Sequence, residues 1–528
     1  MQLLFRAAIA AAVALVLSSP PARAEVKPHG LFTDGVVLQR GMKVPVWGTA
    51  DPGEPVGISW YQGDKWMGAT KPTPADKDGK WRVDLRFDEA GGPYQLKISG
   101  KENEVTVKDV LVGEVWVCSG QSNMEWPVRM SADAESVMKK SANPKIRFFR
   151  VTNGPAQTPE HEVHGKWVEC SPDTIKDKSA VAYFFGKHLY EKLDVPIGLI
   201  QNAWGGTPAE VWTSRAVLEA DPKLKHLIAE FEKRISDYPN QLKAFEPVLA
   251  KYKEEAAKAK SEGKKVPKEP TPPPDPKTFV YNAPFLLYNS RIATIIPFAI
   301  RGAIWYQGES NASEYRAEEY AHLFPTMIQN WRKDWGEGDF PFLFVQLAPF
   351  KKIQDVPTDT PWAWLREAQR QTTLKVPNTG MAVITDVGAE SDIHPKKKQP
   401  VGERLARAAL DLAYGQSGGY TGPVFDSLKI EDGKAIVTFK NTGGALETRG
   451  EDLSGFTIAG KDGKFVHATA VVQGDQVIVS SPSVAEPAAV RFGWADYPVV
   501  NLWGKDGLPA TPFRTDSFPP PWTTKPKK

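Results

Sequence analysis

The hydrophobic and polar positions along this 528-residue chain follow two different periods. In residues 25–108, and again from residue 422 onward, short segments with apolar residues at every second position alternate with Pro, Gly and Asp turns. Between these regions, near-continuous apolar runs alternate with stretches of helical spacing, such as residues 180–193. The first pattern is typical of strands in a β-sandwich, and the second predicts an α/β domain with buried strands.

These patterns divide the chain into three folded parts, as expected for a length too great for one compact domain. We predict an N-terminal β-sandwich over residues 25–108 and an α/β domain over residues 109–418. A C-terminal β-sandwich with a Pro-rich tail follows over residues 419–528.

An insertion, residues 216–278, interrupts the α/β domain. Residues 218–260 are rich in Ala, Leu, Glu and Lys and predict two helices broken near Pro239. Residues 263–276 contain six prolines and cannot form a regular element. We therefore expect a solvated pair of helices followed by an extended return arm.

One apolar run of the α/β domain ends in a turn that can expose a serine. Residues 111–118 contain three valines around Trp116, and the run stops at Gly120. A buried strand that ends in a Gly turn places the next polar residues at the carboxyl edge of the sheet, where open α/β sheets carry their sites. Ser122 is therefore a candidate nucleophile, although it could instead only cap the following helix.

Three later turns also follow apolar runs. One contains the paired glycines Gly205 and Gly206, which let the backbone approach a ligand closely or simply connect a strand to a helix. Another is the polar segment 307–311, and the third is a loop with Asp392 and His394. We expect these turns to meet at the edge that carries the candidate serine.

His394 has the chemistry that a serine nucleophile requires. A serine hydroxyl is a poor nucleophile at neutral pH, and imidazole, with an ordinary pKa of about 6.5, is a suitable base. A carboxylate on the other ring nitrogen orients the imidazole, and Asp392 is two residues away on the same loop. Asp386, Glu390 and Glu403 are the alternative carboxylates, and His394 could also be an ordinary exposed loop residue.

Four sequence blocks together resemble a known enzyme family. GQSNMEWP, WGGTPAEVW, IRGAIWYQGESNA and SDIHPKKKQPVGERLA are similar, in sequence and order, to the motif blocks of the sialate O-acetylesterase-like carbohydrate esterases of the SGNH hydrolase superfamily. The similarity covers roughly residues 105–415. It implies an SGNH-hydrolase fold, a flavodoxin-like three-layer α/β/α domain, here flanked by the two β-sandwich modules.

The resemblance also implies a two-step acyl transfer with Ser122 as nucleophile, His394 as base and Asp392 as its partner. The wider superfamily commonly places its Asp three residues before the His, where this chain has Ser391, but the Asp-Ile-His-Pro sequence matches the sialate esterase-like branch.

The developing oxyanion needs preorganised donors. The resemblance implies the backbone N–H of Ser122, an N–H of Gly205 or, preferably, Gly206, and the side-chain amide of Asn311. Glu309 could support the Asn311 loop instead of binding substrate. Side chains close to these turns are predicted to contact the sugar: Gln121, Trp204, Gln307, Glu309 and Arg366. Of these, Arg366 could instead be a salt-bridged helix residue.

The first 24 residues predict an export signal. Arg6 provides the positive start, residues 7–17 are apolar, and Ala22-Arg23-Ala24 fits a cleavage site. The mature chain then starts at Glu25, and we expect a periplasmic, or alternatively secreted, protein. The apolar run is too short to span a membrane.

Composition narrows the classes of partner. A formal net charge of +3 gives no indication of nucleic-acid binding, and the run Lys396-Lys397-Lys398 is interpreted as an exposed loop face. Cys118 and Cys170 are predicted to be unpaired thiols, although an oxidising compartment would permit a bridge. No spacing typical of a metal site or a nucleotide cofactor is present.

The substrate prediction rests on weaker observations. Seventeen tryptophans, export and flanking β-modules favour acetylated plant cell-wall poly- or oligosaccharides such as xylan or xyloglucan. O-acetylated sialic acid is the alternative, but it would require a positively charged clamp for the sugar carboxylate. Two further hypotheses place the protein in other functional classes. It could be a non-catalytic glycan-binding protein on an esterase scaffold, or a lipase or thioesterase with a long acyl channel.

Overall fold

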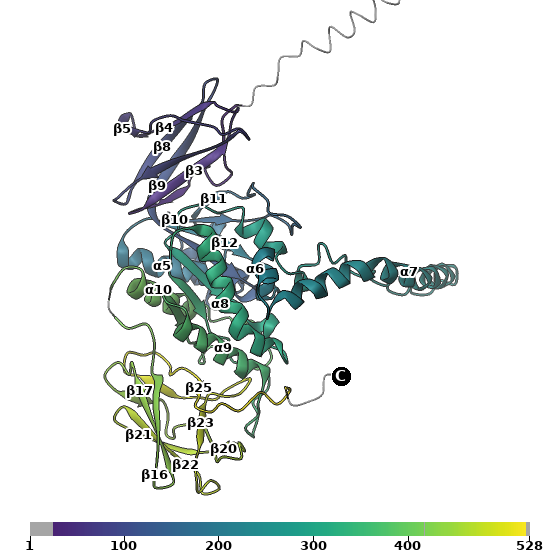
Figure 1. Cartoon of the computed structure of the whole chain (residues 1–528), viewed down its shortest axis with the longest axis vertical. Helices are drawn as coiled ribbons and strands as arrows, with labels where there is room; N and C mark the ends of the chain where they lie inside the picture. The colour runs from purple at the N-terminus through teal and green to yellow at the C-terminus, as the bar shows by residue number, and fades with distance from the viewer. Residues whose placement is uncertain (1–24, 417, 524–528) are drawn as a thin grey trace, which may run out of the picture. The chain divides into compact units, whose positions relative to one another are not determined.

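The computed structural model describes residues 25–416 and 418–523 (Figure 1). The chain divides into two compact units, one ending at Val112 and the other beginning at Gly113. The predicted export signal, residues 1–24, lies outside the described residues. None of the helices within the described ranges combines the length and apolar character needed to cross a membrane.

The first unit consists mainly of antiparallel strands in two sheets. One sheet has the order β1-β3-β7; in the other, β4 pairs with β5, β6 and β8, while β8 and β2 pair with β9, which spans Glu104–Gly120. Alternate residues of β7, Trp81, Val83 and Leu85, are buried, so the period-two prediction is confirmed. The strands are β1 Lys27–Pro28, β2 Val37–Gln39, β3 Lys43–Thr49, β4 Pro55–Gln62, β5 Lys65–Ala69, β6 Thr73–Pro74, β7 Lys80–Arg86 and β8 Gly91–Ser99.

A largely parallel sheet forms the centre of the second unit. Its order is β11-β10-β12-β9-β13-β14-β15, and only β11 runs antiparallel to its neighbour. The strands are β9 Glu104–Gly120, β10 Asn143–Arg150, β11 Trp167–Cys170, β12 Ile197–Ala203, β13 Gly302–Tyr306, β14 Phe342–Val345 and β15 Thr379–Ala382. Because all strands of this order except β11 are parallel, their carboxyl ends lie at one edge.

Helices cover both faces of this sheet (Figure 1). Phe342 and Phe344 of β14 contact the Phe324 ring of α8, with ring centroids 6.0 and 5.0 Å apart. Leu343 points the opposite way, and a Cβ at Gly380 of β15 would lie 3.1 Å both from its Cδ2 atom and from the Cβ of Ala408 of α10. The helices are α2 Ser122–Glu125, α3 Ala134–Lys139, α4 Pro172–Ile175, α5 Ala180–Leu193, α6 Arg215–Ala220, α7 Lys225–Ser261, α8 Arg316–Trp335, α9 Pro361–Lys375 and α10 Gln399–Leu412.

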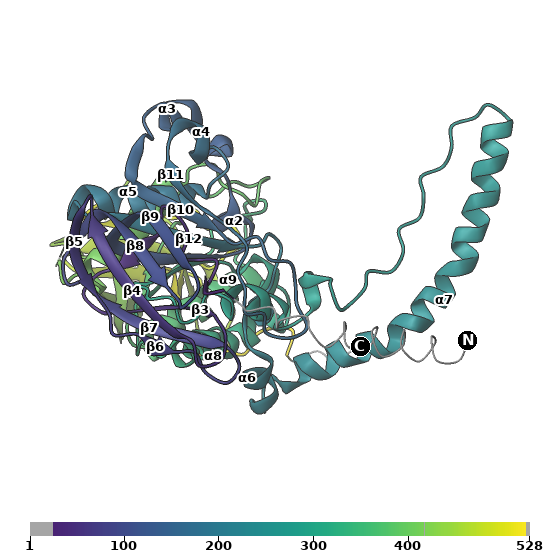
Figure 2. The same ribbon diagram turned by 90° about the horizontal axis from the view of Figure 1, so that it is seen from above.

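The insertion differs from the prediction in one respect. α7 is a single helix of 37 residues that continues through Pro239 and Pro247, so the predicted break is wrong. Only its first turns are buried, and the exposed remainder can bend to accommodate the missing backbone N–H groups and the proline rings. Figure 2 shows this bend and the extended return arm beside it, as predicted for residues 263–276.

The C-terminal strands form three small sheets around one core. Their orders are β16-β17-β22-β21, β20-β19-β23-β25 and β18-β24. Val437, Ile458, Val479, Phe492 and Phe513 lie in the core. The strands are β16 Val424–Glu431, β17 Lys434–Lys440, β18 Leu446–Thr448, β19 Phe456–Ala459, β20 Val466–His467, β21 Thr469–Gln473, β22 Gln476–Ser480, β23 Ala489–Phe492, β24 Leu502–Gly504 and β25 Phe513–Arg514.

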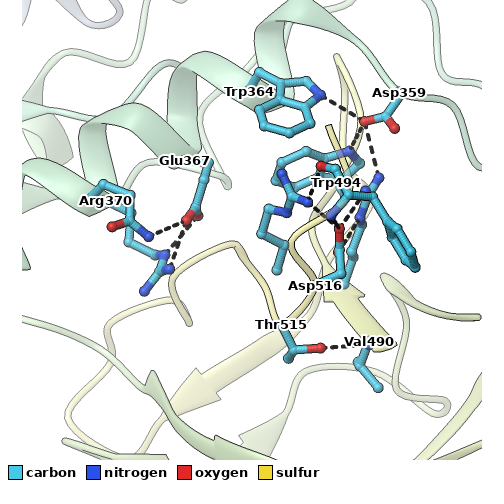
Figure 3. Close-up of polar contacts among 12 residues, drawn as sticks. Asp359, Trp364, Glu367, Arg370, Val490, Trp494, Thr515 and Asp516 are labelled. Carbon is cyan, nitrogen blue, oxygen red and sulfur yellow. Dashed lines mark hydrogen bonds and ion pairs between the residues drawn. The ribbon is translucent and has the colours of Figure 1, made fainter. Parts of the chain in front are cut away.

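Polar contacts connect α9 to these C-terminal strands (Figure 3). Asp359, just before α9, accepts a 2.7 Å hydrogen bond from Trp494 Nε1 and lies 3.1 Å from Arg491 Nη1. Arg491 also donates to Asp516 at 2.8 Å. The side chains of Arg491 and Asp516 are only 3% and 2% exposed, so this is a buried ion-pair network.

Candidate active site

The carboxyl edge of the parallel sheet gathers the turns identified in the sequence. Ser122 follows β9, and Gly205 and Gly206 follow β12. Segment 307–311 follows β13, and the loop with His394 follows β15. Parallel pairing of β9 with both β12 and β13 places the serine turn between two of the others.

A glycine is required immediately before the serine turn. Gly120 has φ +134°, and a Cβ at this position would lie 2.2 Å from the Tyr306 carbonyl oxygen. The close approach of β13 therefore excludes any side chain at Gly120. The chain then turns through Gln121 into α2, which presents Ser122 in a half-buried position.

Ser122 and His394 lie within hydrogen-bonding distance of each other. Ser122 Oγ is 2.8 Å from His394 Nε2, although 272 residues separate them in the sequence. The imidazole stacks on Trp126, with ring centroids 4.8 Å apart and an interplanar angle of 18°. Trp126 was missed by the sequence analysis, although it lies in the same motif block as Ser122.

Asp392 is close to His394 but does not hydrogen-bond its ring. Asp392 Oδ1 is 3.7 Å from His394 Nδ1, which exceeds hydrogen-bonding distance. The same oxygen accepts the backbone N–H of His394 at 2.9 Å. Asp392 therefore shapes the loop and acts on the imidazole through its charge.

The alternative carboxylates are engaged elsewhere. Asp386 forms an ion pair of 2.6 Å with Arg404 of α10. Glu390 accepts a backbone N–H of the 351–353 segment at 3.0 Å, and Glu403 accepts a hydrogen bond within α10. Asp392 is thus the carboxylate that the structure places beside the imidazole.

The surroundings of His394 favour its neutral form. Burial lowers the pKa of His394, the positive charge of Lys398 lowers it further, and Asp392 raises it. The net direction is downward, so the imidazole is free to accept a proton at neutral pH.

The candidate oxyanion donors differ in availability. Gly205 lies next to Ser122, but its N–H donates to Glu125 Oε2 at 2.9 Å. Within residues 25–416 and 418–523, the N–H of Gly206, whose φ is +74°, donates no hydrogen bond to another residue. Asn311 is 2% exposed and its Nδ2 donates to a buried glutamate at 3.0 Å. The Gly206 N–H is therefore the most accessible donor of the three.

Three predicted sugar contacts are bonded inside the protein instead. Gln121 and Gln307 are 3% and 0% exposed. Gln121 Oε1 accepts backbone N–H groups of the 308–310 segment, and Gln307 bonds Asn311 at 2.6 Å. Glu309 accepts a hydrogen bond of 2.6 Å from Asn123. These side chains support the turns in this structure, and their contact with the sugar stays a prediction.

Arg366 is also placed differently from the prediction. It is 1% exposed, and its guanidinium donates to backbone carbonyl groups of Leu347, Ala495 and Asp496. Within residues 25–416 and 418–523 Arg366 forms no salt bridge, because its acceptors are carbonyl oxygens. Those of Ala495 and Asp496 join α9 to the C-terminal strands. Trp204, in contrast, is half-buried at the glycine turn.

Lys398 and the cysteines complete the list of candidate residues. Lys396 and Lys397 are exposed as predicted, but Lys398 is 1% exposed, so its assignment to a solvated face is wrong. Cys118 and Cys170 are both buried and unpaired, which confirms the prediction of free thiols. Burial raises the pKa of both thiols, which disfavours the nucleophilic thiolate.

A serine hydroxyl beside a neutral imidazole, at the carboxyl edge of a parallel sheet, is the arrangement expected of a serine hydrolase. The chain belongs to the carbohydrate esterase, sialic acid-specific acetylesterase family, whose model matches residues 112–245 and 277–411. It is therefore a carbohydrate acetylesterase by family. The match omits residues 246–276, which include the outer part of α7 and the return arm.

Similar proteins support this membership. A carbohydrate acetylesterase of solved structure from Xanthomonas citri is 37% identical, with a TM-score of 0.78, and the match covers 93% of this chain and 100% of that one. Sialate O-acetylesterase from Rattus norvegicus is 29% identical over 426 residues, covering 73% of each chain. The Homo sapiens enzyme of the same name is 28% identical over 432 residues, covering 76% of this chain and 74% of its own.

Proposed function

We propose that this protein is an exported SGNH-type serine esterase that removes O-acetyl groups from plant cell-wall poly- or oligosaccharides of the xylan or xyloglucan type. The observation that carries the proposal is the 2.8 Å distance between Ser122 Oγ and His394 Nε2. The parallel sheet with helices on both faces is consistent with the SGNH-type architecture that the sequence resemblance implies.

In the first step, Ser122 Oγ attacks the acetyl carbonyl carbon while His394 Nε2 accepts the hydroxyl proton. The oxyanion forms beside the N–H groups of Ser122 and Gly206, and His394 then gives the proton to the departing sugar oxygen. Water, deprotonated by the same imidazole, hydrolyses the acyl-enzyme and releases acetate. Asp392 stabilises the transient imidazolium through its charge, at 3.7 Å from Nδ1.

An exposed aromatic residue beside the site supports a sugar substrate. Tyr281 is 47% exposed, and its ring contacts the Gly206 turn so closely that a Cβ at Gly206 would lie 2.8 Å from Tyr281 Cε1. Arg234 of α7 holds this segment by donating to the Asn282 carbonyl oxygen. An aromatic face fixed next to the oxyanion turn can stack on the apolar face of a sugar ring.

Sialic acid is a second candidate sugar, favoured by the description of the family and by the names of its mammalian relatives. Its carboxylate requires a cationic partner. Arg150 reaches this region, but it forms an ion pair with Glu125, with 3.3 Å between Arg150 Nη2 and Glu125 Oε1. The paired charge favours neutral sugars. Acetate release from acetylated xylan, xyloglucan, pectin and sialoglycan, measured side by side, distinguishes the two.

Hydrolysis of p-nitrophenyl acetate by the wild type and by Ser122→Ala tests the chemistry itself. We expect the variant to lose about 10⁴-fold or more in kcat, as for other serine nucleophiles. Equal activity of the two proteins would identify a non-catalytic glycan binder. Faster hydrolysis of octanoate than of acetate esters would identify a lipase or thioesterase, and cell fractionation tests the proposed periplasmic location.

A further inference from the structure

Lys398 is buried behind the loop that carries His394. Its side chain is 1% exposed, and its ammonium group donates a hydrogen bond to Asn123 Oδ1. The Nζ atom lies 5.7 Å from the centre of the Trp126 ring and 5.3 Å from that of Tyr306. Removing an ammonium group from water is costly unless specific partners replace the water, so the partners of Lys398 must offset this cost.

Asn123 connects this ammonium group to the loop. Its Nδ2 donates to the Ile393 carbonyl oxygen at 3.0 Å and to Glu309 Oε1 at 2.6 Å. An ammonium group can only donate, whereas a carbonyl and a carboxylate can only accept. The three partners therefore permit a single orientation of the amide, with Oδ1 toward Lys398.

We propose that Lys398 is a positioning residue for ester hydrolysis: through Asn123 it holds the backbone of Ile393, and with it His394, within reach of Ser122. This inference rests on the proposed function. It also accounts for how the imidazole is held, since its Nδ1 donates no hydrogen bond to the neighbouring carboxylate, which lies 3.7 Å away.

The charged groups around this network give Lys398 a second, measurable effect. Burial lowers the pKa of Lys398 to about 7, although the negative charges of Glu309 and Asp392 raise it. The pKa of His394 is lowered by burial and by Lys398 and is raised by Asp392. In the acid range where His394 titrates, Lys398 is protonated and opposes a second positive charge. Removing the Lys398 charge therefore raises the pKa of His394.

Three lysine variants test the proposal with p-nitrophenyl acetate, each measured for kcat, KM, pH profile and melting temperature. Lys398→Met removes both charge and donor, and we expect kcat to fall about 10²-fold with little change in KM, as for a misplaced catalytic group. Lys398→Gln keeps a donor for Asn123, so kcat stays within about tenfold of the wild type while the acid limb of kcat/KM moves to higher pH. Lys397→Met is the matched control, because Lys397 is exposed, and should behave as the wild type.

Unchanged kcat and pH profiles in both Lys398 variants would overturn the inference, even with Ser122→Ala inactive and the esterase function intact. An active Ser122→Ala would instead overturn the function itself. If Lys398→Met does not fold, Lys398→Gln decides: an acid limb at higher pH shows that Lys398 acts on His394, and an unmoved limb with wild-type kcat refutes the inference.

Discussion

At the scale of single residues, the loop that carries His394 holds its imidazole differently from the histidine of an ordinary Ser-His-Asp triad. His394 stacks on Trp126, and Asp392 bonds its backbone N–H rather than its ring. The imidazole thus depends on the shape of the loop more than on a direct carboxylate bond. The Asp392 side chain therefore has two effects that can be tested separately: its charge acts on the imidazole, and its oxygen holds the turn by accepting the His394 backbone N–H.

Substitution of Asp392 tests this separation. Asp392→Asn keeps an oxygen that can accept the His394 N–H, so only the charge is lost, and we expect kcat to fall by about ten- to a hundredfold. Loss of the buried Asp from a hydrogen-bonded triad costs about 10⁴-fold. Asp392→Ala also removes the turn bond of 2.9 Å and should be the less active of the two. A 10⁴-fold loss in Asp392→Asn would show that the aspartate bonds the ring during turnover.

The pH dependence of kcat/KM should show an acid limb below pH 6.5, since the pKa of His394 is lowered from its ordinary value of 6.5. The sign follows from the base requirement: activity is present above the pKa of His394 and is lost as pH falls through it. Asp392→Asn removes a negative charge and should move the limb to lower pH. A wild-type limb at or above pH 7 would contradict this description of the site.

Sequence reasoning found the residues whose roles follow from local pattern, and it missed those that depend on contacts between distant turns. Ser122 and His394 each follow an apolar run that predicts a strand end. Lys398 belongs to a basic run, and lysine is normally exposed. Its buried ammonium group depends on a hydrogen bond to Asn123 and on the negative charge of Glu309, which follow two other strands. No single stretch of sequence shows that these residues come together.

At the scale of elements, the sequence predicts a helix or strand correctly where buried apolar residues recur at a regular spacing along one segment. The α5 helix was predicted at residues 180–193 and has these bounds, because its apolar residues recur at helical spacing. The predicted break at Pro239 is wrong because the outer part of α7 is exposed. There, a proline costs a hydrogen bond and causes a bend, but no tertiary contact requires the helix to end.

The insertion should influence substrate binding through Tyr281, which follows its return arm. Tyr281→Ala removes the aromatic face, so we expect KM for an acetylated oligosaccharide to rise about five- to thirtyfold, in line with about 1–2 kcal/mol for a stacked ring. Tyr281→Phe keeps the ring and is the matched control. Kinetics with p-nitrophenyl acetate should change little in either variant. Equal KM values for Ala and wild type on the oligosaccharide would exclude stacking at this position.

At the scale of the whole molecule, the C-terminal strands are joined to α9 by buried polar contacts. Arg366 donates to the Ala495 and Asp496 carbonyl groups, and Arg491 bonds both Asp359 and Asp516. Such contacts require both partners to be present, because a buried guanidinium without acceptors is costly. The C-terminal module should therefore unfold together with the α/β domain in one transition.

Asp516 provides a quantitative test of this coupling. Burial alone would raise its pKa, but hydrogen bonds and charge from Arg491 and Arg514 outweigh burial, and the pKa lies below the ordinary 3.8. The carboxylate therefore stabilises the fold above pH 3.8, and this contribution is lost as pH falls through the lowered value. Asp516→Asn removes the carboxylate that Arg514 pairs with and leaves Arg491 with Asp359 as its carboxylate partner, and we expect a loss of about 3–5 kcal/mol in the free energy of unfolding.

Denaturant unfolding at neutral pH measures this loss, with Asp426→Asn as the matched control. Asp426 pairs with Lys440 at 3.5 Å, and their side chains are 46% and 59% exposed, so its loss should cost about 0–1 kcal/mol. The difference in the free energy of unfolding between Asp516→Asn and Asp426→Asn should shrink at acid pH, because the Asp516 carboxylate that Asp426→Asn retains is then protonated. A second, separate transition in Asp516→Asn would show that the ion-pair network couples the unfolding of the two domains. Equal stability of the two variants would show that it contributes nothing beyond an exposed pair.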